Sequence, residues 1–217
     1  MNNNYFKGLS RRDYIQKAYE IIVEEGIQAV SIRRIAKEMQ CSTASLYRYF
    51  SSREELLYYS QLPTLRNYIR KVEKREGTWA NKWEFYKGIW RCFTEEAFHN
   101  AQTYNLLFFG NKSPSQKYAI EEYYEMFPED IENTSGIFKL MLQITDFQSR
   151  DMFILNKYTE TDSLTEENAK ILNRMVCVLF EGYLKEILDG EIGEKAIDDA
   201  VDSYTEDIAH LVSWLAK

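Results

Sequence analysis

Two acid–histidine pairs are the first candidates for a catalytic or metal-binding role in this chain. Glu96 precedes His99 by three positions, and Asp207 precedes His210 by the same interval. Each pair places a carboxylate and an imidazole on one face of a helix, as in half of a di-iron site in a helical bundle. Such a site needs further acids, and isolated pairs at this spacing arise easily by chance. A helical-bundle metal-dependent oxidase is therefore a remote alternative. We expect no enzyme activity, no metal and no cofactor.

A second group of residues, between positions 31 and 53, carries hydroxyl and guanidinium groups suited to binding an anion. Residues 1–53 contain nine Lys or Arg and five Asp or Glu, a net charge of +4. The rest of the chain has 18 basic and 29 acidic residues, a net charge of −11. A basic segment on an acidic chain is typical of a local nucleic-acid-binding surface. An excess of this size also arises by chance, so charge alone does not decide.

The apolar spacing of the first sixty residues predicts four helices that would position these groups. Gly26 can end the first helix, whose apolar face is Ile15, Ala18, Tyr19, Ile22 and Val23. Ser31 and Ser42 can cap a second and a third short helix, because their side chains can accept from free backbone amides. A fourth helix begins at Arg53, followed by two acids. Two short helices joined by a tight turn and packed on a longer one form a helix-turn-helix.

The third helix is expected to present small and basic residues outward. Small residues at its start let the backbone approach base edges in a DNA major groove, and Arg48 can then pair with guanine or phosphate. Phosphate contacts are expected from the preceding helix and from Ser31 at its N-terminus. The complete set of expected DNA contacts is Ser31, Arg33, Arg34, Ser42, Thr43, Ala44, Ser45, Tyr47, Arg48, Tyr49 and Arg53. A three-helix bundle with a solvated basic face is the alternative that these residues leave open.

The motifs in this segment resemble the TetR family of bacterial transcriptional regulators over about residues 10–58. They are Ile15-x-x-Ala18, Gly26, Ser31-Ile32-x-x-Ile35-Ala36, Ser42-Thr43-Ala44-Ser45-Leu46-Tyr47-x-Tyr49-Phe50 and Ser52-Arg53-Glu54-Glu55-Leu56-Leu57. The resemblance implies an all-α protein with a helix-turn-helix domain at 1–57 and a helical effector-binding and dimerisation domain at 58–217. Two positions depart from the family pattern. Gln40 stands where glycine is frequent, and Arg53 replaces the usual lysine.

The remainder of the chain also predicts helices, without strand-like alternation. They are expected at 56–76, 79–97, 101–109, 115–127, 138–158, 166–188 and 194–215. The resemblance implies that the last two pair with their copies in a homodimer, which would bind double-stranded operator DNA. It also implies a repressor that is released from DNA by an unknown small-molecule effector. A DNA-binding regulator without an effector, acting as an activator or through a partner protein, is the main alternative.

An excess of aromatic residues in the predicted body could form an apolar cavity for a lipophilic or aromatic effector. The candidate lining residues are Trp90, Phe93, Tyr104, Phe108, Tyr123, Tyr124, Met141 and Phe147. For any single one of these residues ordinary core packing is the favoured explanation, because aromatics at helical spacing usually fill a core. Asp146 and Arg150, four residues apart, are expected either to orient a polar group of a ligand or to pair with each other.

The composition also indicates the compartment. No run of about 20 apolar residues is present, so we expect no membrane span. The polar stretch Met1–Asn4 differs from a secretory signal, and the three cysteines Cys41, Cys92 and Cys177 do not suggest a disulfide framework. We therefore expect a cytoplasmic protein.

Overall fold

The computed structural model describes residues 8–110, 118–134, 136–144, 146–161 and 163–216 of the chain. These residues form helices and turns, with no β-strand among them, which confirms the expected all-α fold. Residues 1–4, 115–117 and 145, which the predictions for the N-terminus and for the helices at 115–127 and 138–158 covered, lie outside the described residues. No helix in the described ranges has both the length and the apolar character needed to cross a bilayer.

The chain separates into two compact units, which we call the head and the body. The head comprises Met1–Pro63 and Lys112–Glu132, and the body comprises Thr64–Asn111 and Asn133–Lys217. The division predicted from sequence, at residues 57 and 58, assigned 58–63 and 112–132 to the body. Among the described residues, 58–63 and 118–132 group with the head instead, and the contact of Arg11 with Glu122 is one of the long-range contacts that hold the second of these segments there.

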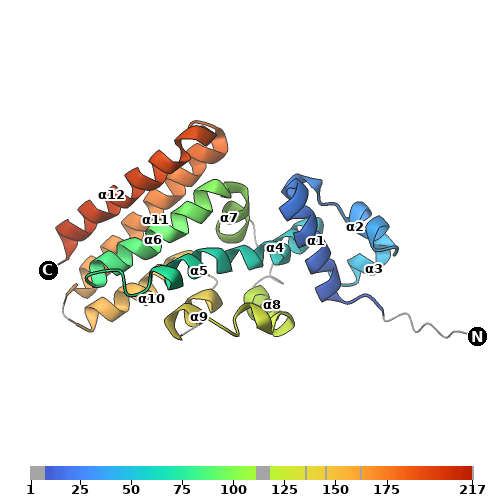
Figure 1. Cartoon of the computed structure of the whole chain (residues 1–217), viewed down its shortest axis with the longest axis horizontal. Coiled ribbons are helices and arrows are strands. Elements are labelled where there is room, and N and C mark those ends of the chain that lie inside the picture. The colour runs from blue at the N-terminus through green and yellow to red at the C-terminus, as the bar shows by residue number, and fades with distance from the viewer. Residues whose placement is uncertain (1–7, 111–117, 135, 145, 162, 217) are drawn as a thin grey trace, which may run out of the picture. The chain divides into compact units, whose positions relative to one another are not determined.

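The head is built on a long first helix. Its described helices are α1 (Arg11–Glu25), η1 (Ile27–Ala29), α2 (Ile32–Glu38), α3 (Thr43–Tyr47), α4 (Arg53–Gln61), α8 (Ala119–Met126) and η4 (Pro128–Asp130) (Figure 1). Helix α1 packs on α4 and α2 packs on α3. Buried side chains from these helices, including Ile15, Ile35 and Leu46, form the core beneath α3. This core fixes α3 with one side facing outward.

Charged groups attach α8 to α1 and α4. The Arg11 guanidinium lies 2.8 Å from a carboxylate oxygen of Glu122 and 3.5 Å from one of Glu55. The Tyr59 hydroxyl donates to Glu122 at 2.5 Å, and Arg11 stacks 4.1 Å above the Tyr59 ring. A further ion pair joins Arg12 to Glu129. These contacts explain why the segment containing α8 belongs to the head.

The body is a bundle of longer helices. They are α5 (Leu65–Arg75), α6 (Lys82–His99), α7 (Ala101–Phe108), α9 (Gly136–Gln143), α10 (Phe147–Thr159), α11 (Glu166–Asp189), η5 (Glu194–Ala196) and α12 (Ile197–Leu215). Helix α6 packs against α5 and α12, and α11 packs against α10 and α12 (Figure 1). Aromatic rings fill the space between them; Phe180 lies within 5.1 Å of Phe93 and 4.9 Å of Phe147 between ring centroids.

Two long helices expected from sequence are interrupted. The predicted helix at 56–76 is divided into α4 and α5 by a turn of 3₁₀ helix, η2 (Leu62–Thr64). Pro63 explains this break, because proline lacks the amide hydrogen that an α-helix needs. The predicted helix at 138–158 is likewise divided into α9 and α10.

Candidate functional site

Helix α3 is a short helix held by its cap and by one buried residue. The Ser42 hydroxyl accepts from the Ser45 amide at 3.2 Å, which confirms the predicted cap, and Leu46 is fully buried. Thr43 and Ala44 are exposed at the start of the helix, whereas Ser45 is half-buried with its hydroxyl 3.0 Å from that of Ser42. The outward side of α3 therefore begins with small side chains, as a backbone approaching base edges requires.

The C-terminal end of α3 carries the larger polar groups. Arg48 is exposed and forms no ion pair or side-chain hydrogen bond with any described residue. Tyr47 is also exposed, at 57% of its surface. Tyr49 is used within the head, where its hydroxyl donates to the Leu9 carbonyl at 3.2 Å and its ring lies 5.8 Å from that of Tyr14. Arg48 and Tyr47 are thus free to meet a partner outside the protein.

The two arginines of α2 have different surroundings. Arg33 is exposed, as is Lys37 one turn later, and neither forms an ion pair with a described residue. Arg34 instead binds Glu25 at 2.9 Å and Glu38 at 2.8 Å. The hydrogen bond from Arg34 holds the pKa of Glu25 below its usual value. Ser31 caps α2 by accepting from the Arg34 amide at 3.1 Å, as predicted.

Arg53, which the sequence placed among the DNA contacts, donates to the protein backbone. Its Nε lies 2.7 Å from the Val30 carbonyl oxygen, and a terminal nitrogen lies 3.1 Å from that of Ile27. The side chain thereby joins the start of α4 to η1 and to the residue that precedes the α2 cap. A structural role accounts for all of these contacts.

The turn between α2 and α3 contains the residue that departs from the family pattern. Gln40 has a φ of +52°, and no other non-glycine residue in the described ranges has a positive φ. Next in the chain, the Cys41 amide donates back to the Ala36 carbonyl at 2.9 Å and closes the end of α2. The turn therefore forms without glycine, with Gln40 in the left-handed conformation that side chains disfavour.

A small cavity lies within the body. Its volume is about 30 Å³, and Trp90, Phe93, Met141 and Phe147 are among its lining residues. Two further predicted residues pack behind it: the rings of Tyr104 and Phe108 lie 5.2 and 5.8 Å from the ring of Phe93. The structure thus brings six of the eight predicted aromatic and methionine residues together in the body.

The other two predicted lining residues, Tyr123 and Tyr124, lie elsewhere. Both are on α8, which belongs to the head, and neither lines the body cavity. Helical spacing along α8 could not reveal this, because the assignment of α8 to the head depends on charged partners distant in sequence.

A buried carboxylate, that of Asp151, also lines the cavity. Asp151 accepts hydrogen bonds from the Tyr86 hydroxyl and from Trp90 Nε1, both at 2.9 Å, and from the Asn173 amide at 3.0 Å. Burial raises the pKa of Asp151 from 3.8 to about 6, although these bonds oppose the change. Asp151 and Asn173 were missed by the sequence analysis. The available signal was a polar residue on an otherwise apolar helix face, between Phe147 and Ile154 in the case of Asp151.

Arg150 and Asp146 do not pair with each other in the structure. Asp146 accepts from the Ser149 amide at 2.7 Å at the start of α10. Arg150 is buried, and its Nε donates to the Ile144 carbonyl at 3.0 Å. Of the two sequence expectations for this pair, the direct ion pair is absent among the described contacts, and Arg150 lines the cavity.

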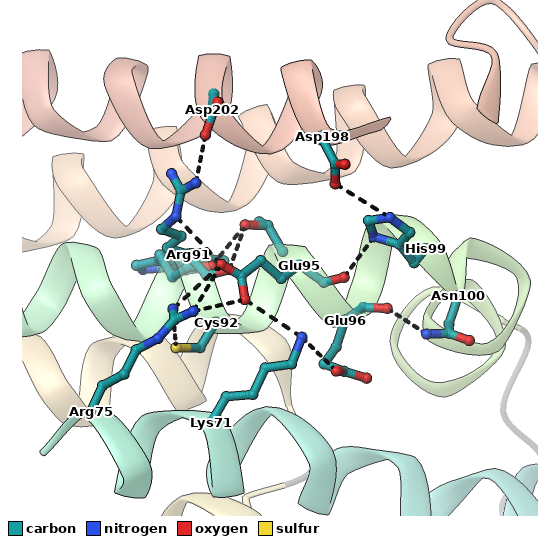
Figure 2. A network of polar contacts seen from close by, with 12 residues as sticks. Lys71, Arg75, Arg91, Cys92, Glu95, Glu96, His99, Asn100, Asp198 and Asp202 are labelled. Carbon is teal, nitrogen blue, oxygen red and sulfur yellow. Dashed lines mark hydrogen bonds and ion pairs between the residues drawn. The ribbon is translucent and has the colours of Figure 1, made fainter. Parts of the chain in front are cut away.

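The acid–histidine pair on α6 belongs to a surface network that joins α5, α6 and α12 (Figure 2). Glu96 binds Lys71 of α5 at 2.7 Å, whereas the His99 ring lies 3.4 Å from Asp198 of α12. Glu95, beside them, contacts both Lys71 and Arg75. The described residues contain no group of three or more His, Cys, Asp or Glu side chains arranged to hold a metal. The pair thus has structural partners that differ from those of a di-iron site.

The two C-terminal helices combine a buried and an exposed apolar surface. On α12, Tyr204 and Ile208 are fully buried in the body core. Val178 of α11 and Trp214 of α12 remain exposed, at 59% and 70%. Gly182 is also at the surface, and apart from its chain neighbours and the adjacent backbone of its own helix no atom lies within 4 Å of the position a β-carbon would take there.

Comparison with known sequences matches the N-terminal segment. Residues 15–58 fit the family model described as bacterial regulatory proteins, tetR family. An HTH-type transcriptional regulator of Staphylococcus aureus is 29% identical over 70 residues, which is 32% of this chain and 38% of that protein. A second regulator from the same species is 40% identical over 42 residues, 19% of this chain and 23% of that protein. The match therefore spans well under half the length of these relatives.

Solved structures extend the likeness to the whole fold. A Rhodococcus protein of unknown function covers 100% of both chains at a TM-score of 0.59 and 16% identity. A Thermus thermophilus TetR family repressor, FadR, in complex with lauroyl-CoA, covers 91% of this chain and 93% of its own at 0.56 and 15%. A TetR family regulator from Shewanella, described as putative in its source, covers 96% and 100% at 0.51 and 14%. At these identities the likeness concerns the fold alone.

Proposed function

Because this chain belongs to the TetR family of transcriptional regulators, we propose that it is a homodimeric repressor that binds operator DNA and releases it when an effector enters the body. The observation that carries the DNA-binding part is the outward side of α3. There, exposed Thr43 and Ala44 precede an arginine, Arg48, with no partner among the described residues. The exposed cations of α2, Arg33 and Lys37, would contact the adjacent phosphates.

The small DNA-contacting surface of α3 favours a dimer. Helix α3 has only five residues, so one copy reaches few base edges. Two copies spaced by about one turn of DNA read two half-sites and multiply the affinity. The exposed apolar residues of α11 and α12, Val178 and Trp214, support a dimer interface on these helices, because large apolar groups at the surface often mark an interface.

The effector response would follow from the connections between the units. The chain passes from head to body after Pro63 and Glu132 and from body to head after Asn111. A ligand that prefers one arrangement of the body helices would change the separation of the two α3 helices in the dimer. It can do so only to the extent that it binds one arrangement more tightly than the other.

DNase footprinting on the DNA that flanks the chain's own gene tests the DNA-binding part. We expect protection of a palindromic site, and affinity that falls as salt rises. A protein that binds all sequences equally, or a footprint unchanged by Arg48→Ala, would contradict the assignment of α3 as the reading helix.

A DNA-binding regulator without an effector is the second candidate, and one observation favours it. The body cavity, at about 30 Å³, holds about two water molecules rather than a ligand. Thermal unfolding with a broad set of lipophilic compounds separates the two candidates. A stabilising compound that also weakens DNA binding supports the effector-responsive repressor, whereas the absence of any such compound supports the second candidate.

A further inference from the structure

The body cavity contains a buried cation with weak contacts. Arg150 is only 4% exposed, and its Nε donates to the Ile144 carbonyl. Its terminal nitrogens lie 3.4 Å from the Tyr68 hydroxyl and 3.5 Å from the Leu142 carbonyl oxygen, the outer limit for a hydrogen bond. No carboxylate of the described residues forms an ion pair with it. Buried charges are normally paired, because desolvation of an unpaired charge is very unfavourable.

Two phenol groups near Arg150 are also donors without acceptors. Tyr68 accepts from Arg150, but its own O–H proton has no acceptor among the described residues. Tyr104 is fully buried, and its hydroxyl has no hydrogen-bond partner at all. Burial raises the pKa of Tyr104 well above its usual value, and Arg150 is close enough to oppose that rise. Since buried polar groups are nearly always hydrogen-bonded, this group of donors is unusual.

The carboxylate of Asp151 does not complete these groups. Asp151 lines the same cavity, but it already accepts hydrogen bonds from Tyr86, Trp90 and Asn173 and forms no ion pair with Arg150 among the described contacts. The group therefore lacks an acceptor, not a donor. A cationic ligand would bring further hydrogen-bond donors to a cavity whose donors already lack acceptors. An anion would instead accept hydrogen bonds from them.

We propose that Arg150, together with Tyr68 and Tyr104, binds the carboxylate of an apolar monocarboxylic acid, and that this acid is the effector. The regulatory half of this inference rests on the proposed function. A single guanidinium balances a single negative charge, and its planar fork matches the two oxygens of a carboxylate. The apolar walls, which include Ile89, Met141 and Phe147, favour a ligand whose remainder is hydrocarbon.

A larger pocket next to the cavity offers room for that hydrocarbon. Its volume is about 290 Å³, and Trp79, Phe85 and Ile137 contribute apolar surface. Ile154 lines both the pocket and the cavity, so the two adjoin at this side chain. For one ligand to occupy both, Ile154 must move. Lys157 lies at the edge of the pocket, exposed and without an ion pair among the described residues, and would attract an anion to the entrance.

Titration calorimetry on the full chain tests the proposal with two pairs of probes: octanoate against octanol, and phenylbutyrate against phenylbutanol. Each pair shares its hydrocarbon and differs in the charged group. We expect at least one acid to bind tenfold or more tightly than its alcohol. Equal affinity within both pairs, or no binding of either acid, would overturn the proposal.

Four variants identify the residues responsible. Arg150→Met is expected to remove the preference for acid over alcohol, and Arg150→Lys to keep part of it. Arg174→Met, which changes an exposed arginine on α11, is expected to leave the preference intact. If the Arg150 variants do not fold, Tyr104→Phe removes only an unpartnered hydroxyl and is expected to weaken acid binding about threefold or more, with alcohol binding unchanged. A preference that persists in all of these variants contradicts the assigned residues.

A DNA-binding assay separates this inference from the function on which it rests. Acids that bind through Arg150 without weakening operator binding would uphold the carboxylate site and contradict the effector-responsive repressor. A different compound that releases DNA equally from wild type and from Arg150→Met would uphold the repressor and contradict the carboxylate site.

Discussion

The head and the body each contain an arginine without an acidic partner, in opposite surroundings. Arg48 lies exposed at the end of α3, whereas Arg150 is 4% exposed among aromatic rings of the body. An exposed guanidinium keeps its hydration, so it can meet a polyanion such as DNA at little desolvation cost, but each contact is weak and screened by salt. A buried guanidinium has already lost its water and interacts strongly with the one group that fits beside it.

This difference suits the two units to different binding partners. Many weak, exposed contacts suit the recognition of a long duplex, because affinity then accumulates over the phosphates and discrimination comes from a few base edges. A few strong, buried contacts suit the recognition of a small ligand, which must be distinguished by its charge and shape.

The largest expected difference between head and body is in how strongly salt weakens binding to each. Arg33, Lys37 and Arg48 give a dimer six exposed cations for phosphate contacts, and a protein with that many contacts loses about 10³-fold in affinity between 50 and 200 mM salt. Binding of a carboxylate at buried Arg150 should change far less over the same range, because buried pairs are poorly screened. Anisotropy titrations with operator DNA and calorimetry with octanoate measure the two. Equal salt slopes would remove the distinction between the units.

Arg48→Ala should have the next largest effect, on DNA affinity alone. Loss of one base contact per subunit costs about 1–3 kcal/mol, so the dimer should lose about 2–6 kcal/mol of operator binding. The melting temperature should not change, since Arg48 has no partner among the described residues. Arg34→Ala is the control: its guanidinium is held by Glu25 and Glu38, so a smaller loss of DNA affinity is expected. A greater loss for Arg34→Ala would reverse the roles that we assign.

The buried carboxylate Asp151 should give the stability of the body an inverted pH dependence. Its pKa rises from 3.8 to about 6 on folding, so between these pH values the native state binds more protons than the unfolded state. The free energy of unfolding should therefore decrease as pH rises from about 4 to about 6, by about 3 kcal/mol in total, and level off above.

Asp151→Asn isolates this contribution. Groups with lowered pKa values, such as Glu20 and Glu122, produce the opposite slope but are present in both proteins and cancel in the comparison. Chemical denaturation followed by tryptophan fluorescence at several pH values measures the difference between wild type and variant. Parallel curves across pH 4–6 would show that Asp151 titrates normally.

Arg53→Met should reduce stability and leave DNA affinity nearly unchanged. The substitution keeps the aliphatic stem but removes the bonds to the Val30 and Ile27 carbonyls, at a cost of about 2 kcal/mol. Arg33→Met is the matched variant, with the opposite expectation of normal stability and weaker DNA binding. Denaturation midpoints and anisotropy titrations of both proteins give the answer. If Arg53→Met instead weakens DNA binding as strongly as Arg33→Met, Arg53 contacts phosphate as the sequence suggested.

The features that sequence predicted well are those decided within a few residues. The caps at Ser31 and Ser42 and the burial of Leu46 follow from side chains and amides at most four positions apart. The attachment of α8 to the head depends on the contact of Arg11 with Glu122, 111 positions away, which no periodicity reveals. The hydrogen bonds of Arg53 could not be predicted from sequence, because their acceptors are backbone carbonyls, which every residue carries. The break at Pro63, by contrast, had a local signal in the proline itself.

In the cavity, too, contacts between residues distant in sequence could not be predicted from spacing. Aromatic spacing predicted which residues of α6 and α7 gather in the body, since those residues face one way on each helix. It could not predict that Arg150 and Asp151, neighbours in the chain, would have separate partners, because these come from α5, α6 and α11. The polar residues that define a ligand's chemistry are positioned by tertiary packing, so the structure was needed to propose a carboxylate.

The smallest predicted effect concerns the turn that aims α3. Gln40 holds a φ of +52°, so Gln40→Gly should relieve left-handed strain and raise the free energy of unfolding by about 1 kcal/mol. Gln28→Gly is the control: this exposed glutamine is not among the residues with positive φ, so glycine there should destabilise the protein by about 0.5–1 kcal/mol. Urea denaturation of the two variants measures the difference. If Gln40→Gly stabilises the head but weakens operator binding, the strained glutamine orients the reading helix. If the variant stabilises the head without changing DNA affinity, the turn tolerates either residue, because the Ser42 cap and Leu46 already fix α3.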